Sequence, residues 1–197
     1  MNSDLILVRH ARVAACYHGV CYGRTDVELG PEGLAESERL AEIMSALPIR
    51  HLITSGAART RVLAERIGAR TGLTMTIELA LLERNFGEWE LRSWDAIYQE
   101  VGDAINGLID EPETFRPPGG ETTGELRDRV VSWYERRPRT GLTVVVAHGG
   151  PIAAIRGTLA GKAPVDWVRL IPQPGSWVRL KGGVDECAYV SQGDRIE

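Results

Sequence analysis

Two histidines and two arginines stand where a site for a phosphate group could form. His10 follows Arg9 at the end of the apolar run LILV, and His148 directly follows the run LTVVVA. Arg59 comes a few residues after a third strand-like run, IRHLIT. Because the carboxyl ends of parallel strands meet at one rim of a sheet, we expect these four side chains to share one pocket.

The four side chains suit phosphate chemistry. A guanidinium is a planar fork that stays charged and binds phosphate oxygens two at a time. A neutral imidazole can attack phosphorus in line, while the arginines and the second histidine stabilise the charge on the equatorial oxygens. An alkoxide leaving group also needs a proton, and Glu83, which follows an apolar run and opens a loop, is our candidate for that acid.

Simpler explanations exist for single residues of this set. An Arg-His dipeptide is common by chance, and Arg59 alone would be an ordinary solvated helix residue. His18 and His51 are interpreted as bystanders. A two-histidine metal site lacks a third ligand at a recognisable spacing, and the arginines would repel a cation. We therefore expect no metal and no cofactor.

The composition fits one domain over residues 1–197, since 197 residues with 43% hydrophobic content can bury one good core. The formal charge of −4 gives no basic surface for nucleic acid or an anionic membrane, so we expect neither as a partner. The longest apolar runs fall far below the roughly 18 residues of a membrane helix, and the first residues do not resemble a signal peptide. A cytoplasmic location is the expectation.

The three cysteines, Cys16, Cys21 and Cys187, make an odd number without a C-x-x-C pair. They favour reduced thiols over a disulfide framework or a zinc site.

Apolar periodicity predicts alternating strands and helices. Strands are expected at residues 5–8, 49–54, 75–79 and 142–147, and helices at 31–47, 57–71 and 93–108. Thr122 and Glu125 have the spacing of a capping box, and Pro151 is expected to start another helix. The tail, WVRLIPQPGSWVRL, predicts one or two edge strands, and such an edge could support a homodimer. The pattern indicates a three-layer α/β/α sandwich with a mostly parallel central sheet.

The inward-facing positions of these helices follow from the same spacing. We expect Leu34, Leu40, Ile43, Met44 and Leu47 to face the core in the first helix, and Trp94, Ile97, Tyr98, Val101, Ile105 and Leu108 in residues 93–108.

Over nearly its whole length the chain resembles the histidine phosphatase superfamily, also called the phosphoglycerate mutase-like family. Five segments occur in the order of that family: LVRHA, TSGAARTRVLAERI, LLERNFGEWE, RPPGGET and VVVAHGGPI. The resemblance implies that His10 is the phosphorylated nucleophile and that Arg9, Arg59 and His148 form the phosphate pocket. It also implies that Glu83 donates a proton and later activates water, and that the fold is phosphoglycerate mutase-like.

Some positions depart from the family pattern. Ala11 replaces a glycine, Cys16 lies near the usual place of an asparagine, and Gly56 replaces a proline. None of these changes removes a catalytic group, so we expect an active enzyme.

The segment GVCYGRTDVEL is similar to that of the α-ribazole phosphatases, which remove phosphate from a cobalamin precursor. In this loop Gly23 could bring its amide to the phosphate, and Tyr22 could stack on a substrate base or simply cover the loop. Gly149, beside His148, is also counted among the substrate-binding residues.

We therefore expect a metal-independent phosphatase acting on a small-molecule phosphate monoester, with α-ribazole 5′-phosphate favoured. A broad-specificity sugar or metabolite phosphatase and a phosphoglycerate mutase are the enzymatic alternatives. The chain's length disfavours the mutase, because family mutases carry extra segments that exclude water. The alternative outside enzymes is an inactive module that binds phospho-ligands or partners, which the intact set of five residues argues against.

Overall fold

A six-stranded sheet forms the centre of the protein. The computed structural model describes residues 4–181 and 184–186. The strands lie in the order β4-β3-β6-β1-β7-β8. Their bounds are β1 Leu5–Arg9, β3 Ile49–Thr54, β4 Met75–Ile77, β6 Leu142–Ala147, β7 Trp177–Lys181 and β8 Val184–Glu186. The first four in this order are parallel, and β7 and β8 are antiparallel to their neighbours. The predicted α/β fold with a mostly parallel sheet is confirmed.

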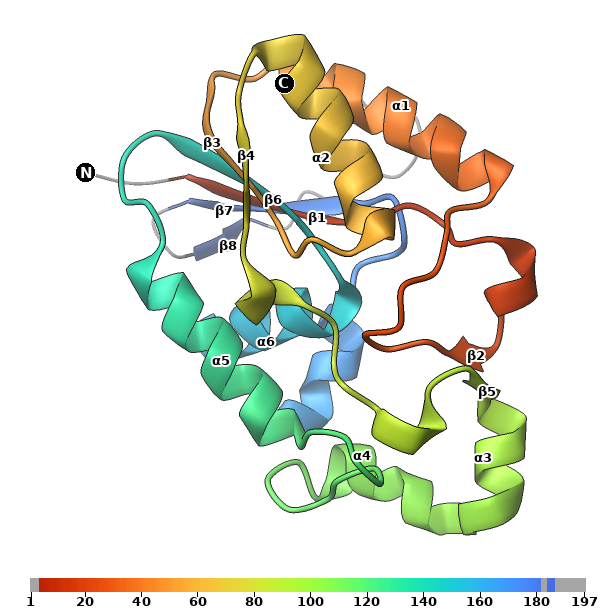
Figure 1. Cartoon of the computed structure of the whole chain (residues 1–197). Helices are drawn as coiled ribbons and strands as arrows, with labels where there is room; N and C mark the ends of the chain where they lie inside the picture. The colour runs from red at the N-terminus through yellow and green to blue at the C-terminus, as the bar shows by residue number, and fades with distance from the viewer. Residues whose placement is uncertain (1–3, 182–183, 187–197) are drawn as a thin grey trace.

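Two pairs of helices cover the sheet, as Figure 1 shows. The helices α1 (Pro31–Ser45) and α2 (Ala58–Thr71) lie on one face, and α5 (Thr123–Arg136) and α6 (Gly149–Leu159) on the other. Successive residues of a strand point to opposite faces, so Ile6 packs beneath the first pair and Leu7 beneath the second. Every residue of β6 is buried, which explains its continuous apolar sequence.

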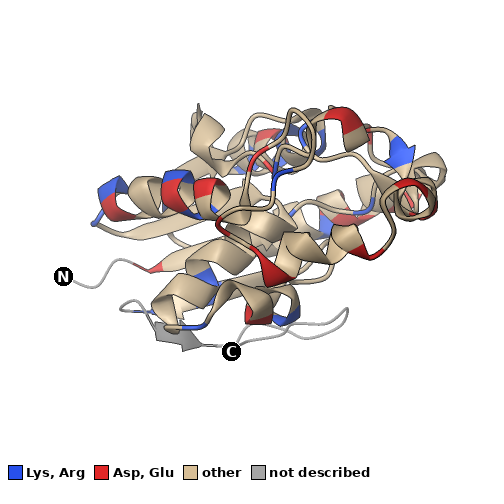
Figure 2. Cartoon of the chain, turned by 90° about the horizontal axis from the view of Figure 1, so that it is seen from below, with Lys and Arg blue, Asp and Glu red and all other residues tan. Residues whose placement is uncertain are grey.

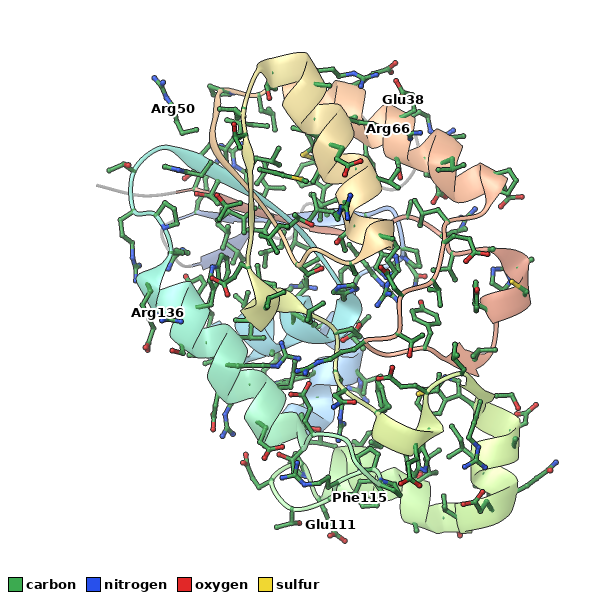
Figure 3. All side chains as sticks on the ribbon, viewed as in Figure 1. Glu38, Arg50, Arg66, Glu111, Phe115 and Arg136 are labelled. Carbon is green, nitrogen blue, oxygen red and sulfur yellow. The ribbon has the colours of Figure 1, made fainter. Side chains whose placement is uncertain are left out.

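An ion pair between two helices and a capping box at the start of a third are examples of the polar contacts that stabilise the helices. Glu38 of α1 and Arg66 of α2 form an ion pair at 3.3 Å, and both are labelled in Figure 3. The predicted capping box is present at the start of α5, where Thr122 and Glu125 exchange side-chain and backbone hydrogen bonds.

A smaller layer lies beside the carboxyl ends of the strands. It contains the two-stranded antiparallel sheet of β2 (Val20–Cys21) and β5 (Arg92–Ser93), with α3 (Trp94–Val101) and α4 (Gly107–Asp110). Cys21, Trp89 and Ile97 form its apolar centre. The 3₁₀ segments of the described chain are Ala15–Tyr17, Leu79–Leu81, Gly87–Trp89, Gly102–Asn106 and Pro164–Leu170.

Residues 93–108 do not form one helix as expected. The helix α3 ends at Gly102, whose φ of +57° is left-handed and suits glycine, and a 3₁₀ turn and α4 follow. Tyr98, which lies within α3, is 52% exposed rather than buried. In α1 the expected inward residue Leu34 is also exposed.

Other boundaries also differ from the sequence prediction; the helix expected at residues 31–47, for example, ends at Ser45. The strand expected at residues 75–79 ends at Ile77, and α6 starts at Gly149 rather than Pro151. The first part of the tail is the 3₁₀ segment Pro164–Leu170, not a strand. The strand β7 is interior, because β1 and β8 both pair with it.

The described residues contain no helix long and apolar enough to span a membrane. Acidic and basic residues are intermixed along the helices in Figure 2.

Candidate active site

His10 lies at the carboxyl end of β1, in the middle of the sheet. Its backbone N–H donates to the carbonyl of Ala147, and its own carbonyl accepts from Gly175 N–H. The side chain is 1% exposed, and Nδ1 lies 2.7 Å from the carbonyl oxygen of Ala11. Because a carbonyl can only accept, Nδ1 carries the proton and Nε2 of the neutral ring keeps its lone pair. His10 is thus held in the tautomer that a nucleophile requires.

His148 follows the neighbouring strand β6 and meets His10 across the strand ends. The two ring centroids are 5.2 Å apart, with planes inclined at 65°. Nε2 of His148 lies 2.8 Å from the hydroxyl of Ser55, at the end of β3. Ser55 is fully buried and also contacts the Thr60 hydroxyl at 3.0 Å. Residues at the ends of three adjacent parallel strands therefore meet, as the sequence predicts.

Arg59, in the first turn of α2, brings a buried positive charge to the two imidazoles. It is 0% exposed and donates to the carbonyls of Gly23 at 2.6 Å and Thr25 at 2.9 Å. The ring of Tyr22 lies 5.1 Å from the guanidinium carbon. The closest carboxylate oxygen, on Asp26, is 4.0 Å away and belongs to an exposed side chain. This buried cation lacks a close, buried carboxylate as partner among the described residues.

Arg9 completes the cationic side of the site. Its terminal nitrogen donates to the carbonyl of Pro172 at 2.7 Å, which orients the guanidinium. Within the part of the chain that the structure describes, three buried nitrogen atoms of this set lack a hydrogen-bond partner: Nε of Arg9, Nε of Arg59 and Nδ1 of His148. Buried polar atoms are normally paired, so three of them in one site indicate a polar ligand, and two of the three belong to cations.

The surroundings keep both imidazoles neutral. Burial, followed by the positive charge of Arg59, lowers the pKa of His10 to about 3. Burial and Arg59 also hold the pKa of His148 well below its usual value. At neutral pH the positive charge of the pocket therefore resides on the arginines, and His10 is available as a nucleophile.

Glu83 lies in a loop, and its carboxyl group packs against the start of α6, beside these side chains. Its carboxyl oxygens accept from the N–H of Gly150 at 3.1 and 3.3 Å, and one also accepts from Arg84 N–H at 3.0 Å. The N-terminal end of a helix attracts a carboxyl group in this way. Since Gly150 follows His148 by two residues, Glu83 lies on the His148 side of the site.

The glycines of the expected binding set have distinct environments. Gly149 has no side chain, and a Cβ there would lie 3.5 Å from Nε of Arg9, so the backbone of α6 approaches the guanidinium closely. Gly23 has a left-handed φ of +42°, and a Cβ there would overlap the Glu90 carboxylate. Its carbonyl orients Arg59.

The remaining histidines lie apart from this group. His51 contacts the carbonyl of Thr140 through Nε2, and His18 is exposed in its loop. Residues 4–181 and 184–186 contain no group of three His, Cys, Asp or Glu side chains that could hold a metal ion. Cys16 is an exposed free thiol, Cys21 is a buried one, and Cys187 lies outside the described residues.

A cavity of about 340 Å³ lies elsewhere, between β3, β4 and the end of α5. Arg50 and Arg136, labelled in Figure 3, are among its lining residues. It includes none of the strand-end residues gathered around His10.

Four residues near the site were missed or left without a role by the sequence interpretation. Ser55 contacts His148, Arg24 and Arg129 donate to the backbone carbonyl of Glu83, and Glu121 accepts from both arginines. Of these, the sequence indicates only Glu121, at the end of PPGGE, and leaves two roles open for it: orienting a pocket arginine, or accepting hydrogen bonds from the turn. Arginines are frequent in this chain, and nothing in their spacing distinguishes Arg24 and Arg129 from the rest.

Two neutral imidazoles, two arginines and a carboxyl group at the strand ends of an α/β sheet fit the class of phosphoryl-transfer enzymes. The sequence matches the model of the Histidine phosphatase superfamily (branch 1) over residues 5–195, and the chain belongs to that family. The family assignment supports a phosphatase.

Similar proteins include both mutases and phosphatases by name. The chain is 28% identical over 161 residues to "Probable phosphoglycerate mutase GpmB" of Salmonella typhi, which covers 80% of this chain and 75% of that protein. A mycobacterial glucosyl-3-phosphoglycerate phosphatase superposes with a TM-score of 0.80 at 25% identity, covering 92% of this chain and 91% of the other. The α-ribazole phosphatase of Shigella flexneri has a TM-score of 0.81 at 20% identity over 98% and 99% of the two chains, a likeness of fold.

Proposed function

We propose that this protein hydrolyses phosphate monoesters through a phosphohistidine formed on His10. The observation that carries the proposal is the meeting of His10 and His148 with Arg9 and Arg59 at the ends of adjacent strands. Three buried nitrogens of this group have no partner in the described part of the chain. A phosphate group supplies oxygen acceptors for all of them, and its charge offsets the arginines.

In the first step Nε2 of His10 attacks phosphorus, and the bond from phosphorus to the ester oxygen breaks. The Ala11 carbonyl keeps the Nδ1–H of His10 in place, so the ring retains one proton as the N–P bond forms. Arg9, Arg59 and an Nδ1–H of His148 bind the equatorial oxygens, where charge accumulates. Glu83, in its protonated form, gives its proton to the departing alkoxide, which leaves as an alcohol.

In the second step the ionised Glu83 accepts a proton from a water molecule, whose oxygen attacks the phosphorus of phosphohistidine. The N–P bond breaks, inorganic phosphate leaves, and both His10 and the protonated Glu83 are regenerated. The enzyme thus returns to its starting protonation state, and water is the second reactant beside the ester.

The nucleophile is tested with p-nitrophenyl phosphate, with and without EDTA, for the wild type and His10→Ala. We expect wild-type turnover to be unaffected by EDTA and the variant to be inactive. Turnover that survives the substitution, or that the chelator abolishes, would reject the phosphohistidine scheme.

The acid is tested with Glu83→Gln on two substrates. Removing the proton donor should slow glycerol 2-phosphate, whose alkoxide leaves poorly, by about 10²–10⁴-fold, and p-nitrophenyl phosphate much less. Equal losses on both substrates would contradict the role of Glu83.

For the substrate we propose α-ribazole 5′-phosphate, on the strength of the GVCYGRTDVEL segment. Tyr22 is partly buried, with its ring 6.5 Å from His10, so a nucleoside base beyond the phosphate could stack on it. A phosphoglycerate derivative is the second candidate, supported by the names of the mutase and mycobacterial relatives. Comparing kcat/KM for α-ribazole 5′-phosphate, 3-phosphoglycerate and glucosyl-3-phosphoglycerate decides between them. A higher value for either glycerate compound would overturn the ribazole proposal.

A further inference from the structure

The backbone of Glu83 is held by two arginines from distant parts of the chain. Its carbonyl oxygen accepts from Nε of Arg24 at 3.2 Å and from a terminal nitrogen of Arg129 at 3.0 Å. Arg24 comes from the loop after β2, and Arg129 from the second turn of α5. Glu83 itself lies between two short 3₁₀ segments, outside any helix or strand that could fix it.

Both arginines are themselves held by one carboxylate, Glu121. Its oxygens accept from Arg129 at 2.7 and 3.1 Å and from Arg24 at 3.1 Å. One of them also accepts from the backbone N–H of Asn85 at 2.9 Å, two residues after Glu83. Glu121 is only 8% exposed, so these charge-assisted bonds are well shielded from water.

We propose that Glu121 is a positioning residue for Glu83, acting through Arg24 and Arg129. This inference rests on the proposed function, in which Glu83 is the acid. The two guanidiniums fix the main chain of Glu83, and the N–H groups of Gly150 and Arg84 fix its carboxyl. Without Glu121, the arginines would lose their shared partner and the acid would lose its fixed position.

The test compares Glu121→Gln with Glu125→Gln. The control removes a carboxylate in the first turn of α5, where Glu125 pairs with Arg116 and does not contact Glu83. Because misplacing the proton donor slows poor leaving groups most, we expect Glu121→Gln to lower kcat/KM for glycerol 2-phosphate about tenfold or more. The loss on p-nitrophenyl phosphate should be about threefold or less. Glu125→Gln should change neither value appreciably.

A double variant separates positioning from general weakening of the fold. If Glu121 acts through Glu83, adding Glu121→Gln to Glu83→Gln should cause little further loss on glycerol 2-phosphate, because the proton donor is already absent. Equal losses of Glu121→Gln on the two substrates, or losses that multiply fully in the double variant, would overturn the proposal.

A second variant covers the case in which Glu121→Gln does not fold. Arg24→Gln removes one donor to the Glu83 carbonyl from a side chain that is 35% exposed. It should give a smaller loss with the same preference for glycerol 2-phosphate, and a uniform loss would contradict the inference. If Glu83→Gln itself shows no such preference, the proposed acid fails. If Glu83→Gln shows it and these variants do not, only the positioning role fails.

Discussion

Replacing Arg59 by methionine should damage phosphate chemistry far more than it damages the fold. Methionine can fill much of the buried volume of the side chain but carries no charge or N–H donor. In the wild type, two N–H groups of Arg59 serve the Gly23 and Thr25 carbonyls. The Nε–H and the second hydrogen on each terminal nitrogen are left for a ligand.

The loss of rate follows from the hydrogen bonds that a phosphate would receive. Two charge-assisted bonds at about 1.5–3 kcal/mol each amount to about 3–6 kcal/mol. At about 1.4 kcal/mol per factor of ten, kcat/KM should fall by about 10²–10⁴-fold.

The effect on stability is smaller because two contributions oppose one another. The Gly23 and Thr25 carbonyls lose a donor, at about 1–3 kcal/mol each if they stay buried. Against this, the fold no longer holds a fully buried cation, whose desolvation costs several kcal/mol. We expect a net change within about 2 kcal/mol, or a Tm shift of about 4–8 °C or less for a chain of this size.

Thermal unfolding with and without inorganic phosphate, alongside kcat/KM on p-nitrophenyl phosphate, measures both effects. Phosphate at 100 times its Kd should stabilise the folded wild type by about 2.7 kcal/mol and so raise its Tm. The Tm of Arg59→Met should be unchanged by phosphate. The matched control is Arg61→Met on the same helix, which removes only a half-exposed ion pair with Glu65. If Arg59→Met keeps the phosphate-induced Tm rise or the wild-type rate, Arg59 does not bind the phosphate group.

Two further predictions concern pH and backbone space. The pKa of His10 is lowered to about 3 in the folded protein, so below about pH 6.5 the unfolded chain binds a proton that the folded one does not. The free energy of unfolding should therefore fall as the pH drops from about 6.5 toward 3. Urea titrations should show a shallower fall for His10→Asn. If the unfolding free energies of the two proteins fall equally with pH, the buried neutral imidazole is contradicted. Gly150→Ala would place a Cβ 2.3 Å from Oε1 of Glu83, so the carboxyl must move. The variant should lose more rate on glycerol 2-phosphate than on p-nitrophenyl phosphate, and unchanged rates on both would show that the position of this carboxyl does not matter.

The parts of the fold that the sequence predicts well are those governed by apolar periodicity. The strands next to His10 and His148 are continuous apolar runs, because both their faces are covered by helices. Periodicity fails where backbone conformation decides. The spacing of residues 93–108 continues past Gly102, but the left-handed φ of that residue ends the helix. In the tail, alternation suggests a strand around Trp167, whose ring instead packs under α6 as part of a 3₁₀ segment.

For the site, the sequence predicts which residues converge but not what holds them. His10, His148, Arg9 and Arg59 could be placed together because parallel strands end at one rim. The contacts of Ser55 with His148, and of Glu121 with Arg24 and Arg129, depend on side-chain directions in loops, which no periodic pattern specifies. Such supporting residues emerge only from three-dimensional packing.

The place of β1 in the sheet has a consequence for how the chain folds. The strand that carries His10 lies between β6 and β7, so the first strand of the chain has both its partners near the other end of the described residues. During synthesis β1 must wait for more than a hundred residues before it can pair, and closing so long a loop makes folding slow. Until then an apolar strand is exposed to other chains and is prone to aggregation. We therefore expect the cluster of His10, His148, Arg9 and Arg59 to form among the last events of folding, and its activity to report completion of the sheet around β1.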